Sequence, residues 1–266
     1  MGPGQKREDP DWVKAAAAAH IYYRVPGMDQ VAVRKDLPFK TTADGPLLFD
    51  IYRPAEQSNA APAVILIHGG PIPANLLTNP KDWRLFESVG RLLGASGLAA
   101  VMFNHRFFGL DKAPQALEDI RDLLKHVESN GVELGVDPAR LCLWVFSGGG
   151  VFLAPFFAER PAGVRCMLAY YAVLHASTPR FSAASQLMEA SGPIPPLLIA
   201  RAGRDLPQLN DGIDYFVGQA LKKNVTLDVM NHATGQHGFD SHDDDDRTRE
   251  ILRRTVEFIR THLNAD

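Results

Sequence analysis

The chain has 266 residues, 45% hydrophobic and 22% charged, so it holds enough apolar side chains for a core and is not expected to be disordered. Its 28 Lys and Arg against 31 Asp and Glu give a net charge of −3, which argues against a nucleic-acid-binding surface. No apolar stretch approaches the roughly 20 residues of a membrane-spanning helix.

The N-terminal residues are charged and proline-rich and do not resemble a secretory signal, so we expect a cytoplasmic protein. Residues 1–30 are predicted to form an arm with a short alanine-rich helix. No later segment reads as a linker, so residues 31–266 are predicted to form a single domain. The two cysteines, Cys142 and Cys166, lie in apolar strand-like runs, which indicates buried thiols.

Two strands are expected first, at residues 31–38 and 47–52, with a turn at Asp44-Gly45-Pro46 between them. Because these strands alternate and no helix separates them, we expect an antiparallel edge to the sheet.

From residue 63 the chain alternates between continuous apolar runs and segments of helical periodicity. This order predicts an α/β fold with a mostly parallel sheet and helices on both faces. The strands are predicted at residues 63–67, 98–104, 140–146, 164–171, 196–200 and 225–230, and the helices at 82–95, 116–130 (ended by Gly131), 213–223 and 246–262.

Ser147 lies where a buried strand meets a helical stretch, and three glycines follow it. A serine on such a sharp turn exposes its hydroxyl at the carboxyl edge of the sheet, where the chemistry of α/β proteins takes place. The alternative is a purely structural role, in which the serine caps the start of a glycine-rich helix. The usual G-x-S-x-G pattern has glycine two residues before the serine, where this chain has Val145.

A serine hydroxyl is a weak nucleophile and requires a neighbouring base. His237 lies on a glycine-flanked loop after the last predicted strand, and Asp205 follows the strand before it, so both should reach the same sheet edge. Histidine titrates near neutral pH, which suits a base that takes and returns a proton. His232 is an alternative base, and Asp211 and Asp214 are alternative acids near the start of the following helix.

The segment His68-Gly69-Gly70-Pro71 follows the first buried strand. We expect backbone N–H groups of Gly69 or Gly70, together with that of Gly148, to bind a developing oxyanion. Pro71 occupies the place of a third glycine and has no N–H to donate. The alternative is a plain tight turn.

These segments resemble the α/β-hydrolase superfamily over nearly the whole chain. AVILIHGGP resembles the oxyanion loop of prolyl oligopeptidase-like and esterase/lipase members, and VDPARLCLWVFSGGG resembles the stretch across their nucleophile turn. GQHGFD is similar to the histidine loop of dienelactone hydrolase-like and esterase-like members. The resemblance implies an eight-stranded-type sheet, Ser147 as nucleophile, Asp205 as acid and His237 as base. It implies no metal and no organic cofactor.

The resemblance also implies a serine hydrolase that cleaves a small-molecule carboxylic ester with a small or medium acyl group through an acyl-enzyme. The alternatives are a peptidase, a lactone or thioester hydrolase of the same fold, and a non-catalytic binding protein on this scaffold. Val145 would favour the binding protein if it distorted the turn at Ser147. Residues 173–195 lie where this superfamily often inserts a cap, so a small lid or a pocket wall is expected there. The sequence indicates no oligomeric state.

Overall fold

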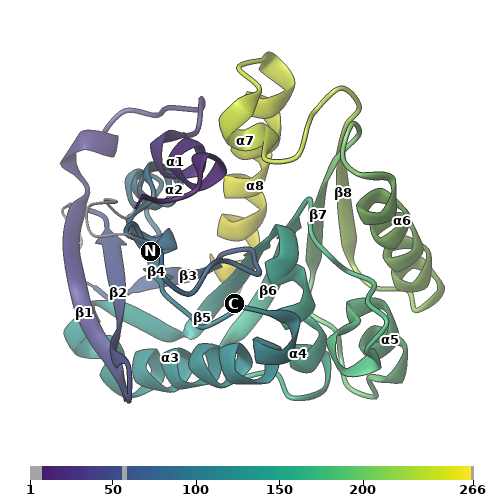
Figure 1. Cartoon of the computed structure of the whole chain (residues 1–266), viewed down its shortest axis with the longest axis horizontal. Coiled ribbons are helices and arrows are strands. Elements are labelled where there is room, and N and C mark those ends of the chain that lie inside the picture. The colour runs from purple at the N-terminus through teal and green to yellow at the C-terminus, as the bar shows by residue number, and fades with distance from the viewer. Residues whose placement is uncertain (1–7, 56–58, 265–266) are drawn as a thin grey trace, which may run out of the picture.

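Eight strands form one sheet in the computed structural model, which describes residues 8–55 and 59–264 (Figure 1). Their order across the sheet is β1-β2-β4-β3-β5-β6-β7-β8. The strands are β1 (Ala32–Thr42), β2 (Gly45–Arg53), β3 (Ala61–Ile67), β4 (Ala99–Phe103), β5 (Val136–Phe146), β6 (Val164–Tyr170), β7 (Leu197–Ala202) and β8 (Leu227–His232).

The predicted antiparallel edge is confirmed, since β1 pairs with β2 and β2 with β4 in antiparallel fashion, while all pairs from β4 through β8 are parallel. The first two strands are longer than predicted and leave only residues 43–44 for the turn. Parallel strands covered on both faces need apolar side chains on both, which explains the unbroken apolar runs of β3 and β4.

Helices cover both faces of the sheet, as predicted (Figure 1). Side chains of α3, α4, α5 and α6 pack on one face, and those of α1, α2 and α8 on the other. The helices are α1 (Asp11–Ala18), α2 (Arg84–Ala95), α3 (Ala113–Leu134), α4 (Ala154–Ala158), α5 (Ala183–Glu189), α6 (Pro207–Lys222), α7 (Phe239–His242) and α8 (Asp246–Asn264).

The predicted end of α3 at Gly131 is wrong. The helix continues to Leu134 and ends at Gly135, whose φ of 69° is left-handed and favours glycine. Gly131 serves packing instead, because a Cβ there would lie 2.8 Å from the carbonyl oxygen of Val136. Cys142 and Cys166 are buried free thiols on paired positions of β5 and β6, as expected.

The expected boundary between an arm and a domain at residue 31 stays a prediction, and residues 1–7 of that arm lie outside the described residues. The predicted short helix is present as α1, with Val13 fully buried against the α2 side of the sheet. This helix lies beside α2 in Figure 1.

Candidate active site

Ser147 stands at the carboxyl end of β5 with a φ of 51°, a left-handed conformation that side-chain-bearing residues rarely adopt. The chain then enters a 3₁₀ helix, η4 (Ser147–Phe152), before the short helix α4. Strain at one residue between a strand and a helix is typical of a position held for function. The serine hydroxyl is thereby presented at the sheet edge.

Glycine is required after Ser147 because the β3 loop lies directly against it. A Cβ at Gly148 would lie 1.8 Å from the carbonyl oxygen of Gly70, and one at Gly149 would lie 2.7 Å from that of His68. Real Cβ contacts are essentially never under 3.0 Å. The two glycines therefore allow the turn and the β3 loop to meet.

Val145 is fully buried, and it faces Ile67 of β3 and Ala169 of β6 across the ladder. The small side chain of Ala169 leaves room beside the branched one. Ser147 keeps its turn conformation with valine at this position, so the sharp strand-to-helix corner does not depend on a glycine there.

His237 lies between an acid and the serine. Its Nδ1 lies 2.7 Å from Asp205 Oδ2, and its Nε2 lies 2.9 Å from Ser147 Oγ. An ionised carboxylate only accepts hydrogen bonds, so Nδ1–H donates to Asp205 and the lone pair of Nε2 accepts the hydroxyl of Ser147. The Asp205 side chain is 1% exposed, which keeps its charge away from bulk water.

The loops after β7 and β8 are tied together, which fixes Asp205 relative to His237. The N–H of Gly203 donates to the His232 carbonyl at 2.8 Å, and the N–H of Arg204 donates to that of Gly235 at 2.8 Å. These backbone bonds continue the β7–β8 ladder beyond the strands. The predicted trio of Ser147, Asp205 and His237 is brought together in this way.

The alternative base and acids have other partners. His232 is buried, with its Nε2 3.2 Å from both Asp245 Oδ1 and Thr248 Oγ1 near the start of α8. Asp214 accepts a hydrogen bond from Arg201 at 2.8 Å, and Asp211 lies exposed on α6. Helix α6 begins earlier than predicted, so both aspartates lie within it.

The acidic run at 243–246 supports the histidine loop and the last helix. Asp243 accepts hydrogen bonds from the backbone and the side-chain nitrogen of Gln236, the residue before His237, at 2.9 and 2.7 Å. Asp245 caps α8 by accepting the N–H of Thr248 at 2.8 Å. Asp243 and Asp245 thus stabilise the histidine loop and the start of α8.

The loop after β3 lines the site with Gly69 and Gly70, and the Gly70–Pro71 peptide bond is cis. Within residues 8–55 and 59–264, neither glycine N–H donates to a partner, whereas the N–H of Ile72 donates to the Phe107 carbonyl at 2.9 Å. The two free N–H groups, with that of Gly148 at the start of η4, remain available to an anionic oxygen.

A buried histidine pair lies under this loop. His68 donates from Nδ1 to the Gly69 carbonyl at 2.6 Å, and its ring stacks on His105 with centroids 3.7 Å apart. Burial lowers the pKa of His68 to about 4 and that of His105 well below its ordinary value. Both rings are therefore neutral at pH 7, and they stack without charge repulsion.

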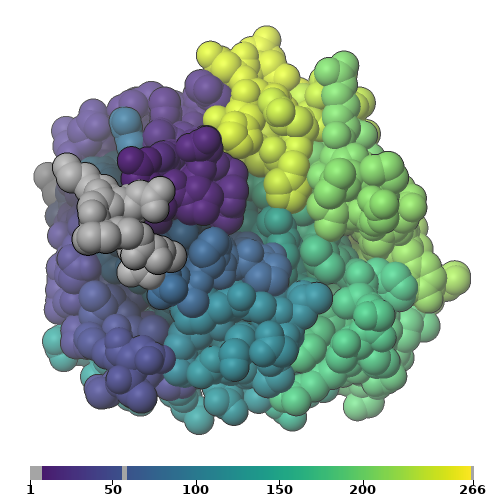
Figure 2. All heavy atoms as spheres, viewed as in Figure 1, coloured from purple at the N-terminus to yellow at the C-terminus, as the bar shows by residue number. Residues whose placement is uncertain are grey.

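A pocket of about 530 Å³ opens at Ser147. Figure 2 shows the surface hollowed between the purple helix α1, the blue loop after β3 and the yellow segment around α7. Most of the wall is apolar or aromatic, so the pocket suits an uncharged ligand group. The lining includes Trp12, Ala15, Ala16, Ile72, Trp83, Leu85, Phe86, Phe146, Tyr171 and His237.

The expected lid or wall at residues 173–195 is not part of this lining. Helix α5 packs instead against α4 and α6, on the far side of the nucleophile turn. Helix α1 forms that wall of the pocket instead. It is held by Asp9, which accepts the N–H groups of Leu77 and Thr78 at 2.7 and 3.0 Å. The rings of Trp12 and Trp83 pack edge to face, with their centroids 6.4 Å apart.

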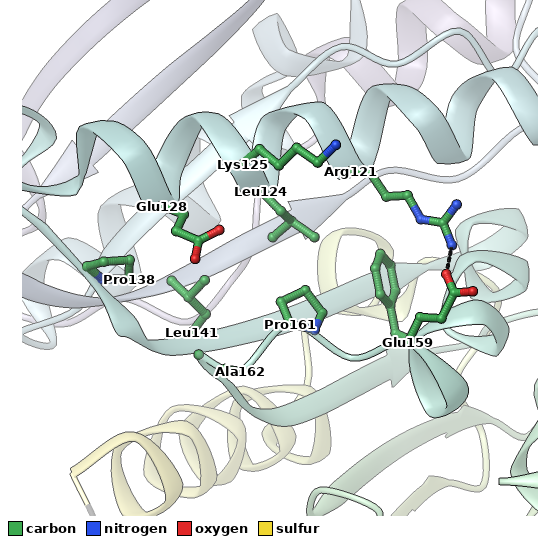
Figure 3. A pocket seen from close by; sticks show the side chains of 11 residues that line it. Arg121, Leu124, Lys125, Glu128, Pro138, Leu141, Glu159, Pro161 and Ala162 are labelled. Carbon is green, nitrogen blue, oxygen red and sulfur yellow. Dashed lines mark hydrogen bonds and ion pairs between the residues drawn. The ribbon is translucent and has the colours of Figure 1, made fainter.

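A second hollow of about 260 Å³ lies between α3 and the start of β5, away from Ser147 (Figure 3). An ion pair between Arg121 and Glu159 closes one end, and Leu124 and Leu141 form part of the floor. Its lining contains no serine, cysteine or histidine that could act as a nucleophile or base. The chemistry-bearing side chains belong to the first pocket.

The fold is shared with solved esterases at low sequence identity. A thermostable esterase from Pseudomonas putida superposes with a TM-score of 0.75 at 18% identity, covering 96% of this chain and 89% of that one. The chain has the α/β-hydrolase fold. A thermostable carboxylesterase from a metagenomic library gives a TM-score of 0.73 at 21% identity, covering 96% of this chain and 94% of that one.

Esterase 2 of Thermogutta terrifontis, solved phosphoramylated by tabun, superposes with a TM-score of 0.71 at 17% identity, covering 91% of this chain and 98% of that one. The sequence model of the BD-FAE family matches residues 49–160, which is less than half of the chain. No curated protein sequence matches the chain significantly.

The part of the chain that the structure describes holds no group of three or more His, Cys, Asp or Glu side chains arranged to bind a metal ion. Across the described ranges 8–55 and 59–264, no helix is both long and apolar enough to span a membrane.

Proposed function

We propose that this α/β-hydrolase is a serine hydrolase that cleaves carboxylic esters with a small or medium acyl group through an acyl-enzyme. The observation that carries the proposal is the hydrogen-bonded chain from Asp205 through His237 to Ser147 at the base of an apolar pocket. Neighbouring structures described as esterases and carboxylesterases support it.

In this mechanism Ser147 Oγ attacks the ester carbonyl carbon while Nε2 of His237 takes the hydroxyl proton. Asp205 stabilises the imidazolium through the Nδ1–H bond. The carbonyl oxygen becomes an oxyanion and accepts N–H groups from Gly148 and from Gly69 or Gly70, each worth roughly 3 kcal/mol in the transition state.

Collapse of the tetrahedral intermediate breaks the bond between the carbonyl carbon and the alcohol oxygen, and His237 passes its proton to the departing alcohol. Water then enters, His237 removes its proton, and the hydroxide attacks the acyl carbon. The ester bond to Ser147 breaks, the acid leaves, and the proton returns to Ser147 Oγ. No step requires a redox partner.

The pocket favours an uncharged substrate group. Its volume of about 530 Å³ and its wall of Trp12, Trp83, Phe86 and Phe146 would bury an apolar chain or ring next to Ser147. Burying each methylene contributes about 0.8 kcal/mol, so selectivity should rise with apolar size until the pocket is filled. The cytoplasmic location and the small-molecule substrate stay predictions.

The test is hydrolysis of 4-nitrophenyl esters from acetate to decanoate, beside a lactone, a thioester and short peptide amides. The wild type should favour the esters, with kcat/KM highest at an intermediate chain length. Ser147→Ala should lose at least about 10³-fold in kcat, since only binding and the oxyanion donors remain. Ser185→Ala, on helix α5 and outside the pocket lining, is the matched control and should retain full activity.

Four outcomes would contradict the proposal. Preferential cleavage of the peptides would favour a peptidase, and preferential cleavage of the lactone or thioester would favour those hydrolases. Substantial turnover remaining in Ser147→Ala would remove the assigned nucleophile. A folded wild type that binds esters without cleaving any of them would favour a binding protein.

A further inference from the structure

A tyrosine and a second buried carboxylate lie beside His237, in addition to Asp205. Tyr171 directly follows β6 with a left-handed φ of 37°, and its N–H is held by the Ala200 carbonyl at 2.8 Å. Its ring centroid is 4.7 Å from that of His237, and its hydroxyl donates to Asp240 Oδ1 at 2.9 Å. The ring therefore contacts the base while the hydroxyl reaches the carboxylate.

The carboxylate of Asp240 lies in an unusual environment. It is the second residue of α7, which begins directly after His237 and Gly238, and it is fully buried. Its Oδ2 has no hydrogen-bond partner among the residues that the structure describes. A buried carboxylate with one free oxygen destabilises a fold unless something compensates for it, and strained or costly groups concentrate at functional sites.

We propose that Tyr171 and Asp240 form a positioning pair for His237, in which the Tyr171 ring restricts the imidazole and the Asp240 carboxylate stabilises the imidazolium. This inference rests on the proposed function, because the imidazolium arises when His237 takes the Ser147 proton. The hydrogen bond from Tyr171 fixes where the Asp240 charge sits. The left-handed backbone at Tyr171 aims its ring at the histidine loop.

The charge of Asp240 depends on pH within the working range of an esterase. The titratable groups that act on it are His237 from the loop after β8, and Tyr171 and Tyr170 from β6 and its end. Burial raises the pKa of Asp240 to about 6, although the Tyr171 hydroxyl and the His237 charge both oppose that rise. Asp240 should thus be charged above about pH 6 and neutral well below it.

The primary experiment compares the wild type with Asp240→Asn over pH 4.5 to 9, measuring kcat and KM for a 4-nitrophenyl ester. Asparagine keeps the acceptor for Tyr171 and removes the charge. The variant should equal the wild type in kcat/KM below about pH 5 and fall about three- to tenfold behind it above pH 7, through kcat. A defect that is the same at every pH would indicate a merely structural role and overturn the inference.

A matched control lies one residue earlier. Tyr170 is buried with its hydroxyl 2.5 Å from Thr255 Oγ1, so Tyr170→Phe removes a buried hydrogen bond next to the pair. It keeps the ring that packs on Tyr171 and leaves the Tyr171 hydroxyl and the Asp240 carboxylate in place. It should lower thermal stability and leave the shape of the pH profile unchanged. A profile shifted in Tyr170→Phe as much as in Asp240→Asn would contradict the assignment.

Tyr171→Phe provides a second variant that keeps the ring. Without the hydroxyl, Asp240 becomes harder to ionise, so this variant should show the same loss at neutral pH as Asp240→Asn. The double variant should lose no more than either single one, since both remove the same charge. Additive losses would mean that the two residues act separately and would refute the pair.

A readout without substrate separates this inference from the proposed function. In ¹⁵N-histidine NMR spectra, the His237 ring resonances, assigned with His237→Gln, should change as Asp240 ionises near pH 6, and this change should be absent from Asp240→Asn. If the wild type cleaves no ester, the proposed function fails, while this change still tests the electrostatic contact. His237 spectra with the same pH dependence around pH 6 in the wild type and in Asp240→Asn would overturn the inference whatever the activity.

Discussion

The contact between Gly148 and the β3 loop makes Gly148→Ala the sharpest perturbation of the proposed oxyanion site. The added Cβ would start 1.8 Å from the Gly70 carbonyl oxygen and 3.0 Å from the Gly70 nitrogen. Reaching a separation of 3.0 Å from that oxygen, the lower limit for real Cβ contacts, requires the two backbones to part by 3.0 − 1.8 = 1.2 Å. Neither partner is a flexible side chain, so the loop itself must move.

Oxyanion donors act at 2.7 to 3.1 Å, so a displacement of about 1 Å removes at least one of them. We expect kcat to fall about 10²- to 10³-fold, which is about 3 to 4 kcal/mol of transition-state stabilisation. KM should change little because the donors bind the oxyanion more strongly than the ground-state carbonyl.

The assay is steady-state hydrolysis of a 4-nitrophenyl ester, with circular dichroism to verify folding. The matched control is Gly218→Ala in the interior of α6, where a Cβ meets nothing within 4 Å. That change should leave kcat unaltered and stabilise the helix by up to about 1 kcal/mol. A folded Gly148→Ala protein with kcat within about threefold of the wild type would refute the placement of the oxyanion donors.

Three further predictions concern stability and specificity. Lys81 is 2% exposed and its Nζ donates to Asp50, which is fully buried. Lys81→Met leaves that carboxylate without its cationic partner, so the free energy of unfolding in urea titrations should fall by about 3 to 5 kcal/mol. A loss as small as that of the surface variant Lys14→Met would contradict this prediction. Ala16→Leu should narrow the pocket and reduce kcat/KM for octanoate esters at least about fivefold more than for acetate esters. Ala18→Leu, outside the pocket lining, should have no such effect. An equal effect of Ala16→Leu on both chain lengths would argue against α1 as a pocket wall. Burial lowers the pKa of His105 well below its ordinary 6.5, so as the pH falls the unfolded chain binds a proton at this residue before the folded protein does. The free energy of unfolding should therefore decline below about pH 6.5, and less steeply in His105→Phe. Parallel curves of unfolding free energy against pH for the two proteins would show that His105 does not cause the decline.

The positions of the central strands could be predicted from the sequence because burial on both faces requires a continuous apolar run. Their order across the sheet was not predicted. The runs at β3 and β4 and the apolar stretch ending at Phe146 each marked a central strand, and a reactive residue after a strand end is a local signal. The juxtaposition of Ser147 and His237 followed from the same logic, since parallel strands bring their carboxyl ends to one edge.

Tertiary contacts explain what the sequence did not reveal. Gly131 and Gly135 carry the same local stop signal, and only the contact of Gly131 with β5 distinguishes a packing glycine from a terminating one. Helix α1 carries no motif, and it becomes a pocket wall only because Asp9 fastens it to the loop at Leu77. Asp240 similarly looks like an ordinary helix-start acid until its burial against Tyr171 is seen.

Covalent labelling tests the central proposal, an activated serine at position 147, most directly. The wild type and Ser147→Ala would be treated with a fluorophosphonate probe, and the modified peptide would be identified by mass spectrometry. We predict a single adduct on Ser147, formed slowly in His237→Gln and absent from Ser147→Ala. A folded wild type that remains unlabelled, or that is labelled at another serine, would contradict the assignment of Ser147 as the nucleophile.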